Sequence, residues 1–400
     1  MKRMMTAATL AALATAPAMA QEVKVGSVAG VTGPIAELVA PIVAGRNLAA
    51  KHVNEQGGVL DGRKLRLILA DGQCDPKAGV DAGQKVVNVE QVVAVVGASC
   101  SGETNGMVQA VTIPAGVVSI SDSATAPSIS DLKDDDLVYR TAASDAYQGA
   151  ALAKLARDEG FSKLAVTYSN DDYNAGIAKV FVDEFKRLGG EVTANQVHEP
   201  NKASYRSEVT TLSQGGAEGL ALFAYYGGSG ITIIRNALET GAFGKFFGAD
   251  GMYDQSVITQ LGAENLVGNV MFTAAASDPE NDSYPMFAEA YTANTDFDPA
   301  APYASQGYDA TFLIALAVEK AGAPDRSKIS AALREVANAP GEVIRPGEWE
   351  KAKKLIAEGK DINYEGASGP VDFDDNGDVA GFYSVNRVAE NGAFALEYLR

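Results

Sequence analysis

The chain has 400 residues, of which 51 are acidic and 33 are lysine or arginine, so its formal net charge at pH 7 is −18. A charge this negative argues against binding of nucleic acid or anionic lipid, both of which call for basic patches. Hydrophobic residues make up 46% of the chain, as in a well-packed globular protein. The length exceeds one typical core, so two domains are expected.

The first twenty residues have the pattern of a secretory signal peptide. Lys2 and Arg3 form a basic start, an apolar run follows, and a small-x-small cleavage site ends at Ala20. The alternative is a short transmembrane anchor, but the apolar run is shorter than a bilayer requires. We therefore expect export, cleavage after Ala20 and a mature chain that begins at Gln21.

Strands and helices alternate through the first part of the mature sequence. The expected strands cover residues 22–30, 63–72, 92–99 and 116–122, and the expected helices cover residues 35–56, 76–90 and 101–111. The first helix stops at a Gly-Gly pair, as helices often do. This β-α-β-α-β order is typical of a parallel sheet covered by helices on both faces.

The alternation of strands and helices begins again after Thr141 and indicates a second doubly wound unit. Its expected strands cover residues 163–171, 191–199, 219–228 and 245–251, with helices between them. Another strand and three helix-like stretches follow. The chain is expected to close with a hairpin over residues 369–388.

Cys74 and Cys100 are the only cysteines of the chain. They lack the C-x-x-C spacing of a redox pair, and a zinc site would call for more ligands than these and two histidines. In an exported protein a structural disulfide is the favoured interpretation. Closing a loop of about 26 residues would contribute roughly 3 kcal/mol on the chain-entropy model.

Candidate binding groups lie in the loops that follow the strands, where open parallel sheets bind ligands. Ser101 would suit an anion such as a carboxylate. Ser123 and Thr125 offer hydroxyls, although turn or capping roles are equally compatible with them. Asp250 could hold an ammonium group or cap the next helix, and Tyr173 could form a pocket wall or simply pack.

Signatures of catalysis are missing from the sequence, which contains neither a G-x-S-x-G elbow nor a phosphate-binding glycine loop. Asp372, Asp374 and Asn376 match the start of a calcium loop, but position twelve is Tyr383 instead of a glutamate. A polar hairpin turn centred on Asn376 and Gly377 is the favoured interpretation. We expect no enzyme, no cofactor and no metal.

At these loops the chain resembles the periplasmic leucine/isoleucine/valine-binding proteins of ABC importers, which have the type I solute-binding fold. The resemblance runs across the mature sequence and is carried by "DGQCDPKAGV", "VVGASCSGET", "SATAPSIS", "YSNDDYNAGIAKVF" and "YYGGSGITIIRNA". It implies a disulfide between the two cysteines, and two lobes, each a doubly wound, mostly parallel sheet, with the ligand cleft between them.

The resemblance also implies residues for an amino-acid ligand. The α-carboxylate would be held by the serine after the second cysteine and by a small-small-threonine loop, which here are Ser101, Ser123, Ala124 and Thr125. Tyr173 matches a tyrosine that opens the first helix of the second lobe. Asp250 stands where the family has a glutamate for the α-ammonium, and Tyr303 matches an aromatic residue near the side-chain pocket.

Two positions depart from the family pattern. Ser229 replaces a tyrosine that follows "YYGG", and Ser99 stands where an apolar side chain would line an aliphatic pocket. The residues expected to hold the α-carboxylate and the α-ammonium of an amino acid are therefore retained, whereas the preference for an aliphatic side chain is open.

The expected protein is a periplasmic substrate-binding protein of an ABC transporter that captures an amino acid, branched-chain first, and delivers it to the membrane permease subunits. It is expected to be a monomer that binds no nucleic acid. The first lobe would comprise residues 21–141 and 276–368, the second residues 142–275 and 369–400, after a signal peptide at 1–20. Alternatives are another small polar or carboxylate solute, such as an amide, a polar amino acid or an aromatic acid, and a sensor ectodomain on the same fold.

Overall fold

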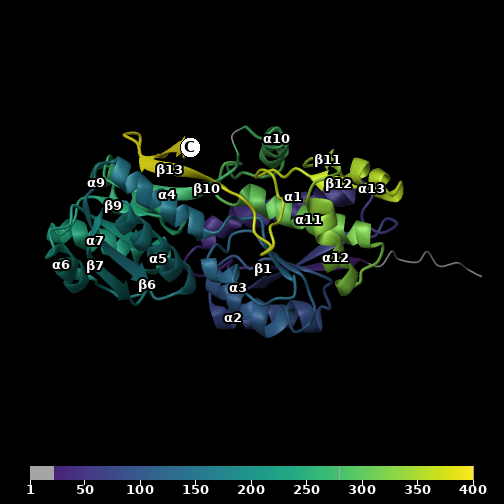
Figure 1. Ribbon diagram of the computed structural model, residues 1–400, viewed down its shortest axis with the longest axis horizontal. Helices are drawn as coiled ribbons and strands as arrows, with labels where there is room; N and C mark the ends of the chain where they lie inside the picture. Colours follow the sequence, from purple (N-terminus) through teal and green to yellow (C-terminus); the bar gives the residue numbers. More distant parts are fainter. Residues whose placement is uncertain (1–21, 279, 400) are drawn as a thin grey trace, which may run out of the picture.

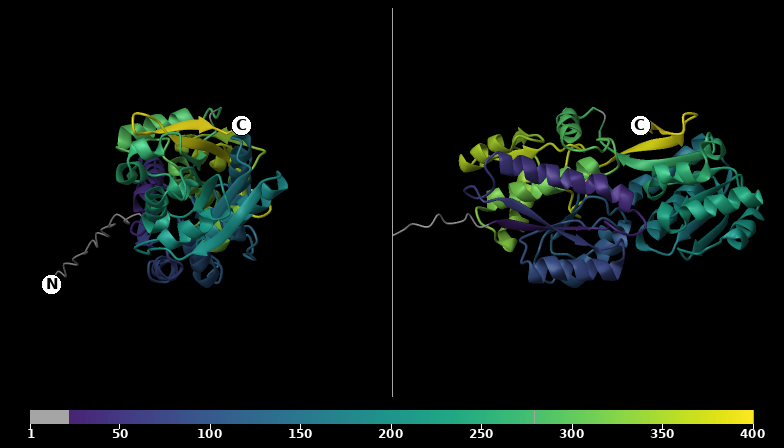
Figure 2. Two further views of the ribbon diagram at one scale, coloured as in Figure 1. Left: turned by 90° about the vertical axis from the view of Figure 1, so that its left-hand side faces the viewer. Right: turned by 180° about the vertical axis from the view of Figure 1, so that it is seen from behind.

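The structure is a computed structural model that describes residues 22–278 and 280–399. The expected signal peptide and its cleavage site lie outside the described residues. Figure 1 shows two lobes side by side along the long axis, one drawn mainly in teal and the other in purple, blue and yellow-green. The views in Figure 2 show the same two bodies from the end and from behind.

Strands and helices alternate along most of the chain, so the predicted α/β fold class is confirmed. The strands are β1 (Val23–Ala29), β2 (Leu65–Asp71), β3 (Val95–Val96), β4 (Ser119–Ser121), β5 (Val138–Arg140), β6 (Lys163–Ser169), β7 (Glu191–His198), β8 (Gly219–Phe223), β9 (Phe246–Gly248), β10 (Val270–Ala276), β11 (Glu342–Ile344), β12 (Ile362–Tyr364), β13 (Phe382–Val388) and β14 (Phe394–Tyr398). The α-helices are α1 (Ala36–Glu55), α2 (Pro76–Gln84), α3 (Ser101–Met107), α4 (Asp145–Asp158), α5 (Asp172–Arg187), α6 (Arg206–Ser213), α7 (Ile231–Thr240), α8 (Gln255–Leu261), α9 (Ala263–Leu266), α10 (Tyr284–Asn294), α11 (Ala304–Ala321), α12 (Arg326–Ala337) and α13 (Trp349–Ala357). None of the helices in the described part of the chain combines the length and apolar character needed to span a membrane.

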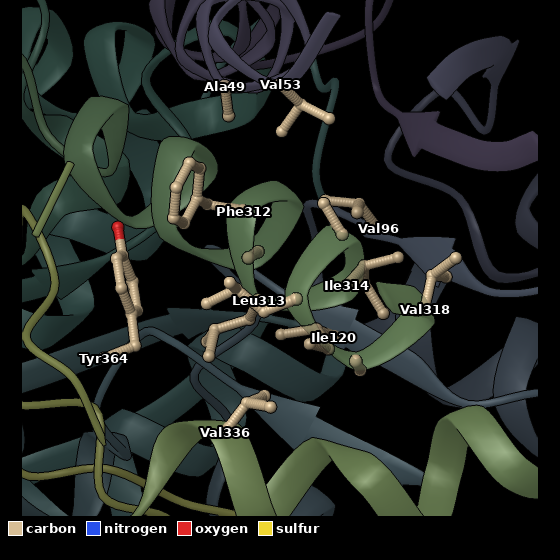
Figure 3. Close-up of a cluster of buried hydrophobic side chains, with 14 of the residues drawn as sticks. Ala49, Val53, Val96, Ile120, Phe312, Leu313, Ile314, Val318, Val336 and Tyr364 are labelled. Atoms are coloured by element: carbon tan, nitrogen blue, oxygen red, sulfur yellow. The ribbon is translucent and has the colours of Figure 1, made fainter. Parts of the chain in front are cut away.

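The first lobe is built on a parallel sheet with the strand order β2-β1-β3-β4-β5. Helices α1 and α11 cover one face, where Val53 and Phe312 join Val96 and Ile120 in one buried cluster (Figure 3). Helices α2 and α3 pack on the other face. Helices therefore cover this sheet on both faces, as is usual for a parallel sheet.

The second lobe is built on a sheet with the order β14-β13-β10-β9-β8-β6-β7. Strands β6 to β10 are parallel, whereas β13 and β14 run antiparallel at one edge. Helices α4 and α5 bury Leu152 and Phe181 against one face, and α6, α7 and α8 bury Val209, Ile234 and Val257 against the other. Both lobes therefore present the carboxyl ends of parallel strands, the edge at which such sheets bind ligands.

The lobe boundaries follow from which sheet and core each segment joins. The first sheet ends with β5 at Arg140, and β10 of the second sheet ends at Ala276. Beyond Ser368, however, Val371, Phe373 and Val379 still lie in the core cluster of the first lobe. The chain passes from one lobe to the other three times. We therefore propose that the third of these crossings lies between Val379 and β13, later in the chain than the expected boundary at 368.

The closing hairpin also differs from the prediction over 369–388. It is formed by β13 and β14, while the segment around Asn376 is a compact turn without flanking strands. The Asp374 carboxylate accepts hydrogen bonds from the backbone N–H groups of Asn376, at 2.8 Å, and Asp378, at 3.0 Å. The apolar side chains of this segment, Val371, Phe373 and Val379, instead lie in the core cluster of the first lobe.

Candidate functional site

A disulfide joins the two cysteines, as predicted. Cys74 follows β2 and Cys100 is the N-cap residue of α3, and their Cα atoms are 5.2 Å apart. Both sulfur atoms are used in the bridge, so neither forms a free thiol. The bridge connects two loops at the carboxyl edge of the first sheet and holds the segment from Ser99 to Ser101 in place.

The predicted hydroxyl groups of the first lobe form a local hydrogen-bond network. Ser101 Oγ accepts bonds from the backbone N–H groups of Thr125, at 3.2 Å, and Ala126, at 3.0 Å. Ser101 therefore keeps its own proton free for an incoming acceptor. By contrast, the hydroxyl of Ser123 donates to the Ser99 carbonyl at 2.9 Å, and that of Thr125 donates to Asp145 at 2.8 Å.

Asp250 supplies the carboxylate of the second lobe. It follows β9 and is buried, and its Oδ1 atom accepts hydrogen bonds from Gln148 Nε2 at 2.7 Å and from the Tyr173 hydroxyl at 3.0 Å. Burial raises the pKa of Asp250, an effect that the two hydrogen bonds oppose. The Tyr173 ring stacks on Tyr225, with 5.3 Å between centroids, which fixes the orientation of its hydroxyl.

Asp145 is a second buried carboxylate, which the sequence analysis missed. It is the first residue of α4 and fully buried; Oδ2 accepts from Thr125, and Oδ1 has no hydrogen-bond partner among the described residues. Burial, and then the charge of Asp250, raises the pKa of Asp145 well above its usual range. Aspartate is common at helix starts as a capping residue, so nothing in the sequence indicated that Asp145 would be a buried carboxylate near Asp250.

Most of the predicted residues line one small cavity between the lobes. The cavity is lined by Ile35, Leu38, Ser99, Ser101, Ser123, Tyr173, Tyr225, Asp250 and Tyr303. Its volume is about 10 Å³, close to the space that one water molecule needs. Ala124 and Thr125 are buried but do not line it, and Tyr303 places there a hydroxyl without a hydrogen-bond partner among the described residues.

Ser229 lies in a larger, adjoining cavity of about 580 Å³. From the first lobe this cavity is lined by the disulfide and by residues 33–34, 73, 75–76 and 102; from the second lobe, it is lined by residues 169–172, 200–201, 225 and 227–229. Tyr225 belongs to both cavities. The Tyr225 side chain therefore forms part of the wall of both spaces.

Metal-binding groups are not part of this arrangement. The described residues contain no group of three or more histidine, cysteine or carboxylate side chains that could hold an ion. Asp374, at the start of the calcium-like sequence, instead uses its carboxylate to form the turn.

Known proteins resemble the chain over most of its length. A family model described as "Periplasmic binding protein" matches residues 22–392. A leucine-, isoleucine-, valine-, threonine- and alanine-binding protein of Pseudomonas aeruginosa is 29% identical over 341 residues, which are 84% of this chain and 88% of that protein. A Leu/Ile/Val-binding protein of Escherichia coli K12 is 27% identical over 255 residues, 63% of this chain and 67% of that protein.

Solved structures share the fold. The leucine-binding protein LivK of Thermotoga maritima superimposes with a TM-score of 0.77 at 25% identity, covering 94% of this chain and 97% of that one. LivJ of Streptococcus pneumoniae, solved with isoleucine, gives a TM-score of 0.78 at 23% identity and covers 95% and 99%. These likenesses confirm the predicted fold, and together with the family match over residues 22–392 they show that the chain belongs to the periplasmic binding protein family.

Proposed function

We propose that this protein captures an amino acid between its two lobes and delivers it to the membrane subunits of an ABC permease. The observation that carries the proposal is the pairing of two groups in one cavity. Asp250 contributes a buried carboxylate from the second lobe, and Ser101 contributes a hydroxyl with a free proton from the first. A zwitterion satisfies both, with its ammonium on Asp250 and its carboxylate on Ser101.

The electrostatics of Asp250 favour a cationic ligand group. Its carboxylate is buried, and burial raises its pKa, so the ionised form is costly without a positive partner. Arg140 is paired with Asp378 and is thus engaged elsewhere. An α-ammonium group on Asp250 would lower the pKa of this carboxylate and would be paired in turn.

The closeness of the lobes supports capture by closure. Hydrogen bonds cross between them, from Asn105 Nδ2 to Asp172 Oδ2 at 2.8 Å and from the Thr125 hydroxyl to Asp145 Oδ2 at 2.8 Å. The small cavity leaves too little room for an amino acid to enter. The ligand must therefore enter while the lobes are apart, and they would close over it by hinge motion at the three crossings.

Relatives narrow the ligand class. The two relatives described above are named for leucine, isoleucine and valine among their ligands, and Ile35 and Leu38 give the small cavity an apolar wall. A branched-chain amino acid is therefore the first candidate, and threonine, for which the Pseudomonas aeruginosa relative is also named, is the candidate of the same size with a polar side chain. We further propose export to the periplasm with cleavage after Ala20, and a monomeric mature protein without a cofactor.

The test is calorimetric titration of ligand-stripped protein with leucine, isoleucine and valine. Asp250→Asn keeps the shape of the side chain and removes the charge, so binding should be lost while the circular dichroism spectrum stays unchanged. Asp158→Asn, an exposed aspartate on α4, is the matched control and should bind as the parent does. Retained binding by Asp250→Asn would refute the ammonium contact.

A further inference from the structure

A chain of three side chains ends at the wall of the larger cavity. His198, the last residue of β7, is buried; its Nδ1 atom lies 2.8 Å from Thr167 Oγ1 on β6, and its Nε2 atom lies 2.8 Å from Ser229 Oγ. Thr167 in turn donates to the Gln196 carbonyl at 3.0 Å. No other hydrogen bond reaches Ser229 Oγ from the described residues.

The direction of these hydrogen bonds follows from counting protons. Burial lowers the pKa of His198 to about 4, so the ring is neutral near pH 7 and carries one N–H. A carbonyl only accepts, so the Thr167 hydroxyl donates its proton to the Gln196 carbonyl. The Thr167 oxygen then accepts from Nδ1–H of His198. Nε2 is then the acceptor, and the hydroxyl of Ser229 must donate to it.

The Ser229 hydroxyl therefore has lone pairs, and no proton, left for a ligand. The charged groups of the lining have the same bias, because it includes the carboxylates of Asp75, Asp171 and Asp172 and no lysine, arginine or histidine among its described residues. Its side-chain amides, which can donate as well as accept, belong to Gln73, Asn170 and Asn201. Each carboxylate accepts from the protein: Asp75 from the backbone of α2, Asp171 from Asn174, and Asp172 from Asn105. The charged groups of the wall therefore all accept hydrogen bonds and carry negative charge.

We propose that Ser229 accepts a hydrogen bond from the side chain of the ligand, so that the preferred amino acids carry a hydroxyl or an amide N–H there. This inference rests on the proposed function, which places the amino and carboxyl groups in the small cavity. The side chain then runs past Tyr225 into the larger cavity. A ligand with an apolar side chain leaves the free lone pairs of Ser229 without a donor, and one with a side-chain carboxylate meets the negative charge of Asp75, Asp171 and Asp172.

Pairs of ligands with the same shape test this preference. Threonine and valine differ by a hydroxyl in place of a methyl group, and asparagine and leucine are similar in size. One hydrogen bond corresponds to roughly a tenfold difference in affinity, so threonine should bind about tenfold tighter than valine by calorimetry. Ser229→Ala should abolish the difference while retaining binding of both.

Thr167→Val tests the relay without touching the cavity wall. It removes the acceptor for Nδ1–H and releases the tautomer of His198, so the preference for threonine should shrink although Ser229 is present. A merely structural Thr167 would weaken threonine and valine equally and overturn the relay.

The proton positions can be read directly from ¹⁵N spectra of histidine-labelled, untagged protein. The chain has two histidines, and a His52→Gln variant assigns the signals. A protonated Nδ1 and an unprotonated Nε2 on His198 support the proposal; the reverse tautomer overturns it, because Ser229 would then be a donor. If valine binds as tightly as threonine, the side-chain preference is wrong although the proposed function stands. If no amino acid binds, the proposed function itself fails, and the preference fails with it.

Discussion

Glu103 gives the stability of the first lobe a specific dependence on pH. The residue lies in the first turn of α3 beside the disulfide, is fully buried, and accepts a hydrogen bond from the Cys100 backbone N–H at 3.1 Å. Burial raises the pKa of its carboxyl from 4.5 to about 7, against the opposing effect of the Cys100 N–H. Its second oxygen has no partner among the described residues.

The direction in which stability changes with pH follows from proton binding by Glu103. Between pH 4.5 and about 7 the folded protein holds a proton on Glu103 that the unfolded chain has lost. The stabilising contribution is therefore complete below pH 4.5 and is lost as the pH rises through 7. At about 1.4 kcal/mol per pH unit, the change is about 3 kcal/mol in the free energy of unfolding.

Glu103→Gln removes this titration but keeps the shape of the side chain and an oxygen for the Cys100 N–H. We expect urea denaturation to show that the free energy of unfolding of the variant, relative to that of the parent, rises by about 3 kcal/mol from acid to neutral or alkaline pH. Glu55→Gln, an exposed change on α1, should follow the parent. Parallel pH profiles for Glu103→Gln and the parent would refute the reasoning, because the carboxyl would then titrate alike in the folded and unfolded states.

Three further changes test other parts of the structure by urea denaturation. Asp378→Ala should cost about 3–5 kcal/mol, because it leaves the guanidinium of the fully buried Arg140 unpaired, whereas Asp375→Ala, an exposed neighbour, should cost less than about 0.5 kcal/mol. Reducing the disulfide should lower the free energy of unfolding by roughly 3 kcal/mol, given its separation of 26 residues; an unchanged value would contradict the chain-entropy argument. Phe312→Ala should cost about 3–5 kcal/mol by opening a cavity in the core of the first lobe, and a small loss would mean that the core closes around it.

Local patterns predicted the fold where periodicity and stop signals agree. The expected helix over 35–56 is α1, Ala36–Glu55, because a long apolar periodicity ends at a Gly-Gly pair. The segment from 370 to 380 was expected to be part of the closing hairpin, but none of the strands lies in it. Its apolar residues Val371, Phe373 and Val379 belong to the core cluster of the first lobe, where Phe373 packs against Tyr139 of β5. A local sequence pattern alone cannot tell which partner an apolar side chain meets.

The candidate site was predictable where its groups lie at strand ends. Asp250, Ser101 and Tyr173 do line one cavity, although their roles remain proposals. Gln148 was missed because its partner Asp250 is 102 residues away in the sequence. His198 lies in the strand expected over residues 191–199, which is the edge strand β7, but its contact with Ser229 depends on how β7 and the turn before α7 lie in space.

The two buried carboxylates explain why a ligand would favour closed lobes. Thr125 of the first lobe donates to Asp145 of the second, so closure itself provides Asp145 with a donor. The hydrogen bonds that Asp250 Oδ1 accepts from Gln148 and Tyr173 come from its own lobe, and burying its charge without a cation is costly. An α-ammonium group removes that cost only when the lobes are closed around it. A ligand shifts an equilibrium by its difference in affinity for the two states, and this difference is what Asp250 would provide.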